Sequence, residues 1–382
     1  MAESLDFPIT AVGAATPVGL SAGASCAALR AGIARLGPVP TFLVNGELVG
    51  GEPAVGGRVP LEWLTGGPEE IEWTGHRLFG RDDPPPPEAW IPSGPSRLAD
   101  LARPAAREAW AAAGFGSVGD QGEWIRNPLR SSERIGVYLG LDPRDEAAPA
   151  LDAVIDVIGA PPAVRHAERE GRAAALVALR QAAKDLLAGK IDVALVGGVD
   201  SLLRAEAMSA LRDAGTLKSA SRPTGVLPGE AAAFFVVERS VPSNRRPLAV
   251  LQSVVDEEEP TVGTEDPNIA RGLTRALRRA RLSAPPLAAR PLAVCDLNGD
   301  RSRALEWGMA SMRAFADLHS PTLMWHPADC IGDAGAGLGA LNIVWGATAL
   351  AKGYAGTDRV LVWGASDGPA RAAALLASAP KA

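Results

Sequence analysis

The chain has 382 residues, of which 47% are hydrophobic and 21% charged, so it can bury a large core in two domains or in one duplicated unit. Its formal net charge of −6 gives no basic field that would hold nucleic acid or an anionic membrane surface. No apolar run approaches the roughly 20 residues that cross a bilayer, and the N-terminus lacks the pattern of a secretory leader. We therefore expect a cytoplasmic protein that binds neither nucleic acid nor membrane.

Strand and helix patterns alternate along the N-terminal half. A short apolar strand begins at Ile9, and an Ala-rich helix is expected at about residues 21–31. Residues 41–96 are rich in Gly and Pro and contain the run Pro84–Pro87, which indicates an irregular surface excursion. The further elements expected are a helix over 96–114, a strand over 134–140, a helix near 148–158, a helix over 171–187 and a strand over 193–200.

The C-terminal half repeats this pattern. A Gly-rich helix over residues 335–352 precedes the strand Val360–Asp367, which can be laid over the strand Val193–Asp200. Each of these strands follows a helix of small and apolar residues, so a duplication of α/β units is the better explanation of the match. We predict two halves, residues 1–240 and 241–382, and a mostly parallel sheet with both faces covered.

Cysteine and histidine usage gives no sign of a metal or a disulfide. Cys26, Cys295 and Cys330 lie far apart and form no C-x-x-C pair, which predicts reduced thiols. The four histidines show no ligand spacing, and the sequence contains no G-x-x-x-x-G-K-(S/T) phosphate loop. We therefore expect no cofactor and no metal.

Several segments carry a known pattern in a fixed order along most of the chain. They are ITAVGAATPVG near the N-terminus, SRLADLARPAAREAWAAAG followed by RIGVYLG, GKIDVALVGGVDS, and the segment Leu227–Glu238. Together they resemble the thiolase-fold condensing enzymes, most closely the β-ketoacyl-acyl-carrier-protein synthases that elongate fatty acids and polyketides. The resemblance implies a thiolase-like α/β fold whose duplicated halves form α-β-α-β-α layers, and a dimer that acts on acyl thioesters.

The resemblance also implies a catalytic Cys at the start of a helix, two His in C-terminal loops and a nearby Lys. Counting back from Gly197 places Arg172 at the Cys position, and the loop motifs place Asn298 and Asp333 at the two His positions and Ala328 at the Lys. Arginine cannot carry an acyl group as a thioester, and asparagine cannot shuttle a proton. No catalytic position is intact, so we expect the condensing activity to be lost.

An arginine and an aspartate at neighbouring former catalytic positions predict an ion pair, because burying either charge alone is unfavourable. We expect Arg172 to pair with Asp333, directly or through Asp300 or Asp329. Cys295 and Cys330 lie in the same two loops, where either could serve as a replacement thiol nucleophile. The expected pocket comprises Arg172, Cys295, Asn298, Asp300, Asp329, Cys330 and Asp333.

Two functions are compatible with this pattern. The first is a degenerate synthase-like protein that works by binding, either as a chain-length-factor-like subunit or as a secretion-effector adaptor, the role attributed to thiolase-like proteins near type VI secretion effector genes. Its partner would be a second copy, a synthase, an acyl carrier protein or an effector. The segment between Gly140 and Arg172 is shorter than the family usually carries, which favours the adaptor. The alternative is an acyltransferase or decarboxylase of altered chemistry that uses Asn298 in an oxyanion hole.

Overall fold

A computed structural model describes residues 5–38, 43–44, 47–48, 55–60, 95–118, 124–127, 130, 132–219, 222–241, 245–320 and 322–380. Most of the excursion expected at residues 41–96, including Pro84–Pro87, lies outside the described residues.

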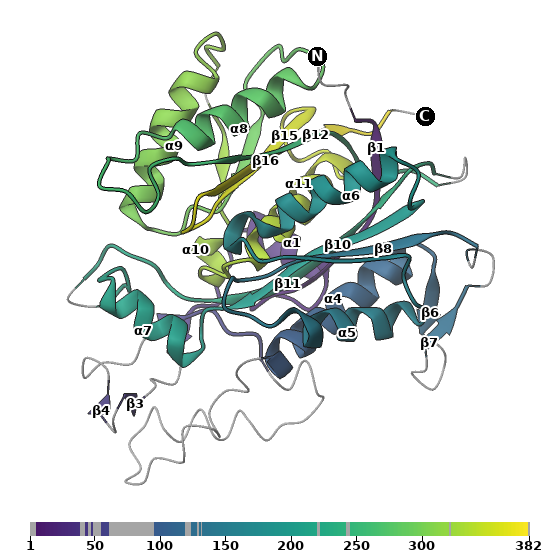
Figure 1. Ribbon diagram of the computed structural model, residues 1–382, viewed down its shortest axis with the longest axis horizontal. Coiled ribbons are helices and arrows are strands. Elements are labelled where there is room, and N and C mark those ends of the chain that lie inside the picture. Colours follow the sequence, from purple (N-terminus) through teal and green to yellow (C-terminus); the bar gives the residue numbers. More distant parts are fainter. Residues whose placement is uncertain are drawn as a thin grey trace.

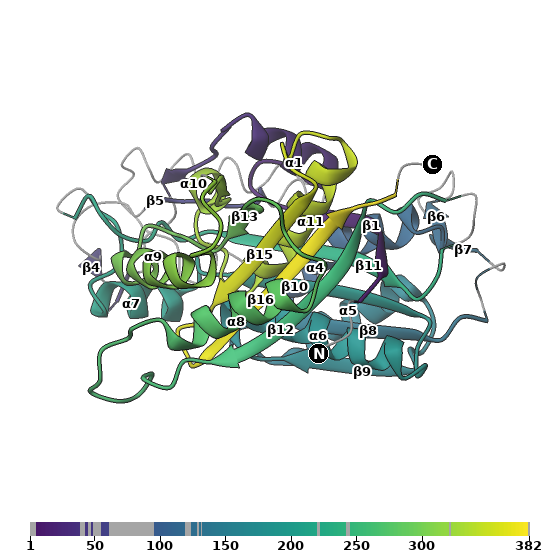
Figure 2. The ribbon, with the colours of Figure 1, turned by 90° about the horizontal axis from the view of Figure 1, so that it is seen from above.

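One mixed sheet of ten strands organises the protein, in the order β14-β13-β15-β16-β12-β1-β11-β10-β8-β9 (Figures 1 and 2). The strands of its first half are β1 (Phe7–Ala15), β8 (Ile135–Gly140), β9 (Val164–Glu168), β10 (Val193–Ser201) and β11 (Glu230–Glu238). Those of its second half are β12 (Ala249–Glu258), β13 (Leu292–Cys295), β14 (Met324–Trp325), β15 (Arg359–Ala365) and β16 (Ala370–Ser378).

The sheet is not mostly parallel, so that part of the prediction is wrong. Four pairings are parallel, namely β8 with β9 and β10, and β13 with β14 and β15. The five pairings that link β10, β11, β1, β12, β16 and β15 are antiparallel. One cause is visible at the end of β15, where residues 366–369 return the chain into β16 and are too few for a parallel crossover.

Helices cover the sheet in the predicted α-β-α-β-α layers (Figure 1). The single sheet supplies both β layers, because its two halves lie on either side of the central helices. The outer layers are α4 (Pro95–Ala112) with α5 (Ala147–Ile158), and α8 (Arg271–Leu282) with α9 (Arg301–Ala314). The central layer holds α6 (Ala174–Leu187), α11 (Gly337–Ala351) and the shorter α1 (Ala22–Arg30). All residues of α11 from Gly337 to Leu350 are buried, because this helix contacts strands from both halves of the sheet. The thiolase-like fold class is therefore confirmed.

Both halves of the sheet share one strand order. Reading inwards, β9-β8-β10-β11-β1 matches β14-β13-β15-β16-β12, and β1 pairs with β12 at the centre. Strands β10 and β15 take equivalent places in the two halves, as the match between Val193–Asp200 and Val360–Asp367 predicts. The shared order supports a duplication, and the division between residues 240 and 241 stays a prediction.

The remaining elements are short. They are α7 (Ala205–Asp213), α10 (Ala328–Ile331), a 3₁₀ turn (Gly171–Ala173), and the strand pairs β2 (Gly37–Pro38) with β5 (Val55–Gly56), β3 (Leu43–Val44) with β4 (Glu47–Leu48), and β6 (Gly116–Val118) with β7 (Trp124–Arg126). Across the described part of the chain, no helix is both long enough and apolar enough to span a membrane.

Candidate functional site

Arg172 sits in the 3₁₀ turn that leads into α6. Its side chain is only 7% exposed. Two glycines allow the turn to pack this closely, because a Cβ atom would lie 2.8 Å from the Arg172 carbonyl oxygen at Gly364 and 3.0 Å from it at Gly339. The sequence thus places a cation where strand β15 and helix α11 meet the start of α6.

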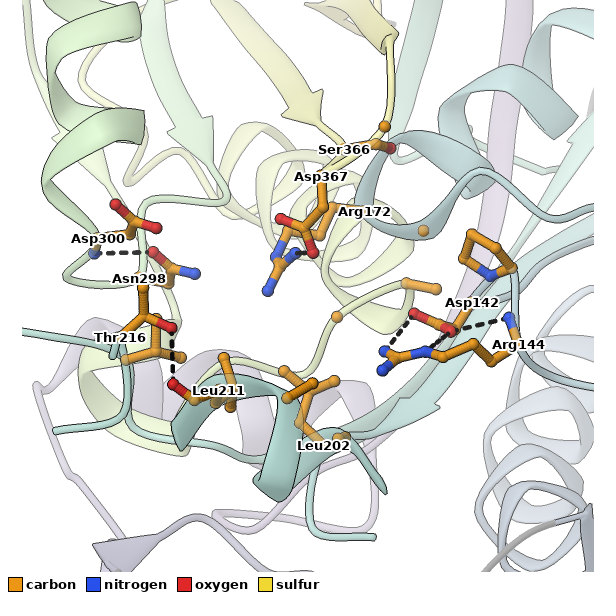
Figure 3. A pocket seen from close by; sticks show the side chains of 18 of the residues that line it. Asp142, Arg144, Arg172, Leu202, Leu211, Thr216, Asn298, Asp300, Ser366 and Asp367 are labelled. Atoms are coloured by element: carbon orange, nitrogen blue, oxygen red, sulfur yellow. Dashed lines mark hydrogen bonds and ion pairs between the residues drawn. The ribbon is translucent and has the colours of Figure 1, made fainter. Parts of the chain in front are cut away.

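Two carboxylates hold the Arg172 guanidinium. Its Nε lies 3.2 Å from Asp333 Oδ2, and its Nη2 donates to the same oxygen. Its Nη1 donates to Asp367 Oδ2 at 2.9 Å, and Figure 3 shows these two side chains together. Asn298 Nδ2 also donates to Asp333 Oδ2, at 2.6 Å. The expected ion pair between Arg172 and Asp333 is therefore present and direct, without Asp300 or Asp329 as an intermediary.

Charge balance explains why an arginine is stable in this position. Burial by itself would lower the pKa of Arg172, but the charges of Asp333 and Asp367 outweigh burial and raise that pKa well above its ordinary value. The Asp333 side chain is fully buried and also accepts a hydrogen bond from the Gly335 N–H at 2.9 Å. Three side chains that the sequence predicts to lie together thus form one bonded group: Arg172, Asn298 and Asp333.

Three charged residues that sequence reasoning missed extend this group. Asp367 accepts a hydrogen bond from Arg303 Nη2, and Arg303 Nη1 lies 3.4 Å from the buried Asp296 Oδ2. Although partial desolvation at the pocket opposes it, the cations Arg172 and Arg303 hold the pKa of Asp367 far below its usual range. The sequence held one sign of Asp367, because this residue ends the segment Val360–Asp367 and matches Asp200 at the end of Val193–Asp200.

A second charged cluster lies across from the first. Arg204 Nη2 lies 3.2 Å from Asp200 Oδ1 and 3.5 Å from Asp142 Oδ1, and Arg204 Nη1 donates to Asp145. Burial, reinforced by the charges of Asp142 and Asp145, raises the pKa of Asp200 despite the cation of Arg204. Arg144 Nε donates to Asp142 Oδ1 at 2.7 Å and extends this cluster towards solvent.

A pocket of about 510 Å³ opens between the two clusters. Figure 3 shows Asn298 and Asp300 on one side of it, Asp142 and Arg144 on the opposite side, and Arg172 behind Asp367. The apolar wall is formed by α7 and its flanking segments, with Leu202, Ala207, Ala210, Leu211, Ala214 and Val226. The charged residues of the lining are Asp142, Arg144, Glu170, Arg172, Asp300, Arg303 and Asp367.

The structure does not bring all the expected residues to this pocket. Arg172, Asn298 and Asp300 line it and Asp333 bonds to two of them, but the described lining lacks Cys295, Asp329 and Cys330. Cys295 is buried at the end of β13, and the Asp329 side chain on α10 is 70% exposed to solvent. The Ala328 side chain, at the expected Lys position, is buried at the start of α10. No three His, Cys, Asp or Glu side chains in the described ranges are placed to share a metal ion.

All three cysteine thiols should be unreactive in the folded protein. Each is buried, and burial raises the pKa of Cys26 to about 11 and also raises the pKa values of Cys295 and Cys330. We expect a thiol-specific disulfide reagent at pH 7.5 to label none of them within minutes, and to label all three after unfolding in urea. Rapid labelling of one cysteine in the native state would contradict this and restore a thiol nucleophile as a candidate.

Asp296 should make the stability of the protein depend on pH. Burial raises the pKa of Asp296 to about 6, although Arg303 and the Ala365 N–H act in the opposite direction. A carboxyl of the unfolded chain titrates near pH 4, so the stability given by the neutral form is present below about pH 4 and is lost as the pH rises towards 6. In the variant Asp296→Asn, the side-chain amide does not titrate between pH 4 and 7.

Urea unfolding of both proteins should therefore show the variant gaining in unfolding free energy relative to the natural protein between about pH 4 and 7. A difference that stays constant over this range would show that Asp296 is already ionised in the native state at the lower pH.

Comparisons with known proteins agree with this architecture. Residues 171–242 match the family model described as beta-ketoacyl synthase, N-terminal domain. A search of curated proteins returned no match to the sequence. Among solved structures, the chain is similar to one described as a type II PKS acyl-carrier protein in complex with its ketosynthase bound to the hexaketide, at 12% identity and a TM-score of 0.77, with 98% of this chain and 100% of that chain covered.

Two further structures show the same likeness. The ishigamide ketosynthase/chain length factor is 20% identical with a TM-score of 0.64, and the match covers 98% of this chain and 99% of that chain. The ketosynthase from module 6 of the bacillaene synthase from Bacillus subtilis 168 is 14% identical with a TM-score of 0.71, over 98% of this chain and 72% of that chain. The chain therefore has the ketosynthase fold, and the family's sequence pattern is present over residues 171–242.

Proposed function

We propose that this chain with a ketosynthase fold has no condensing activity and works by binding a protein partner. The observation that carries the proposal is the bonded group of Arg172, Asn298 and Asp333, at the positions where the resemblance implies one Cys and two His. Condensation by the family's route needs a thiolate nucleophile and imidazoles that move protons. None of these three side chains supplies a thiolate or an imidazole, and the one carboxylate among them, Asp333, is bound to Arg172 and Asn298.

The hydrogen bonds of the site also disfavour an acyltransferase of altered chemistry. An oxyanion hole needs donors that point at the place where charge develops. Asn298 Nδ2 already donates to Asp333, and its Oδ1 accepts from the Asp300 N–H at 3.0 Å. At the start of α6, the Ala173 N–H donates to Ser366 Oγ at 3.1 Å. These donors are engaged within the protein itself.

The sheet offers a surface for a partner. Within the described strands, β9 is an outer edge that pairs with β8 on one side only. A half-exposed edge strand of five residues is a template for pairing with another chain. Two of the structural relatives are described as a ketosynthase/chain length factor and as an acyl-carrier protein in complex with its ketosynthase. We therefore favour a synthase-fold partner bound at β9, which is a chain-length-factor-like role.

The short segment between Gly140 and Arg172 favours the adaptor version, which is the second candidate. Isolation of the tagged full-length protein from its natural cells separates the two versions. A synthase-fold protein recovered at equal stoichiometry supports the chain-length-factor-like role, and a secretion effector recovered instead supports the adaptor. A monomer that condenses acyl thioesters on its own would contradict both.

Cross-linking locates the partner surface. The natural cysteines are buried, so Arg165→Cys would place an exposed thiol on β9, and Arg278→Cys would place a matched one on α8 in the far outer layer. With a short bismaleimide and the isolated partner, we expect the cross-link from position 165 and not from position 278. Equal cross-linking from both positions, or from 278 alone, would exclude the β9 surface.

A further inference from the structure

The pocket above Arg172 has more negative than positive charge around it. Its lining carries four carboxylates and three guanidiniums. Directly behind the lining, Asp333 and Asp296 bond to Arg172 and Arg303, and Asp145 and Asp200 bond to Arg204. The lining and the charged residues directly behind it thus hold eight carboxyl groups and four guanidiniums.

The arginines of the lining are already bound to carboxylates of this chain. Arg172 bonds to Asp333 and Asp367, Arg303 bonds to Asp367, and Arg144 bonds to Asp142. An arriving anion would have to displace one of these internal carboxylates. The guanidiniums therefore do not make the pocket a site for a phosphate or a carboxylate.

Several of the carboxylates, in contrast, have oxygens available to a ligand. Asp367 bridges two arginines, yet 79% of its side chain is exposed. The Glu170 carboxylate makes no hydrogen bond or ion pair with the other described residues, and burial together with the charges of Glu168 and Glu258 raises its pKa. Asp300 uses Oδ1 to cap helix α9 through the Ser302 N–H. All three residues belong to the lining of the pocket, which the apolar α7 wall faces.

We infer that this pocket binds a cationic group carried on an apolar stem, meaning an aliphatic ammonium or guanidinium. Its charged end would meet Asp367 and Glu170, whose backbone oxygen accepts from the neighbouring Ser366, and its stem would lie on the wall that contains Leu202 and Leu211. A volume of about 510 Å³ is within the usual range of ligand pockets. The inference deepens the proposed binding role and rests on it, because it takes the pocket as a recognition site for a Lys or Arg side chain of a partner or for a free amine.

Three probes of equal length test the sign of the charge. Titration calorimetry of the full-length protein would compare hexylamine, hexanoate and hexanol at pH 7.5. We expect hexylamine to bind at least about tenfold more tightly than hexanoate, and its affinity to fall as salt is added. Hexanoate binding as tightly as hexylamine, or no measurable binding of hexylamine, would overturn the inference.

Three variants connect binding to this pocket. Glu170→Gln should weaken hexylamine binding several-fold, whereas Glu265→Gln, at an exposed loop position outside the pocket, should leave it unchanged. Asp367→Asn releases Arg172 and Arg303 and should shift the preference towards hexanoate. Equal hexylamine affinity in the natural protein and in Glu170→Gln would place the binding elsewhere and overturn the assignment.

The source of the cation is a separate arm of the same experiment. Binding of N-acetyl-lysine methylamide comparable to that of hexylamine indicates a side chain of a partner protein, and binding of hexylamine alone indicates a free amine. Failure of all amine probes would leave the partner complex and its β9 cross-link unaffected. Acyl turnover combined with tight amine binding would overturn the proposed non-catalytic role, but the amine site in the pocket would stand.

Discussion

Replacing Arg172 with alanine should lower the free energy of unfolding by about 3–5 kcal/mol, the usual cost of removing one partner of a buried ion pair. Asp333 is fully buried and would keep its hydrogen bonds from Asn298 and Gly335 but lose the guanidinium that neutralises it. The loss of the Asp367 contact adds little, because that side chain is largely exposed. Urea unfolding followed by circular dichroism would measure the change.

The matched control is Arg144→Ala. Arg144 also pairs with an aspartate, Asp142, but its side chain is 48% exposed, so the loss should be about 0–1 kcal/mol. The double variant Arg172→Leu with Asp333→Leu removes both charges and should be more stable than Arg172→Ala, because no uncompensated charge remains. An Arg172→Ala protein that unfolds at the same urea concentration as the natural protein would show that the pair does not hold the site together.

Gly335→Ala should also destabilise the protein, by more than about 2 kcal/mol. Gly335 adopts a φ of +48°, which side-chain-bearing residues rarely take, and a Cβ atom there would overlap the fully buried Asp200 carboxylate. Gly335 follows Asp333 by two residues, so the substitution would disturb both charged clusters. The midpoint of thermal unfolding should fall accordingly.

Gly308→Ala provides the opposite control. Gly308 lies within α9, and a Cβ atom there would have nothing within 4 Å. Alanine should therefore stabilise the helix by about 0.5–1 kcal/mol, because it restricts the unfolded chain more than glycine does. Equal effects of the two substitutions would mean that the loop around Asp333 adapts without cost, which would contradict the close packing of Gly335 on Asp200.

The elements that could be predicted best from the sequence are those with a clear local pattern of apolar residues. The strands at β8, β10 and β15 are continuous apolar runs, and the helices α4, α6 and α11 begin and end within a few residues of the predicted positions. The pair of Arg172 and Asp333 was predictable because both residues fall in motifs with a fixed place in the fold. A buried cation and a buried anion in neighbouring motifs have a strong reason to meet.

The rest depends on contacts that no local pattern encodes. The pairing of β16 with β12, the packing of α7 as a pocket wall and the bridge from Asp367 to Arg303 join segments that are distant in the sequence. Proximity in sequence also misled, because Asp329 and Cys330 share a loop region with Asp333 yet are not part of the pocket lining. Side-chain direction within a short helix such as α10 is set by packing, which the sequence alone did not reveal.

Intact mass spectrometry gives the most direct test of the central claim that the substituted site has lost acyl transfer. The full-length protein would be incubated with malonyl and longer acyl thioesters on a carrier protein, beside an active ketosynthase as the positive control, and carbon dioxide release would be followed. The ion-paired site predicts an unchanged mass and no release above background. A mass increase equal to one acyl group, together with turnover of the thioester, would contradict it.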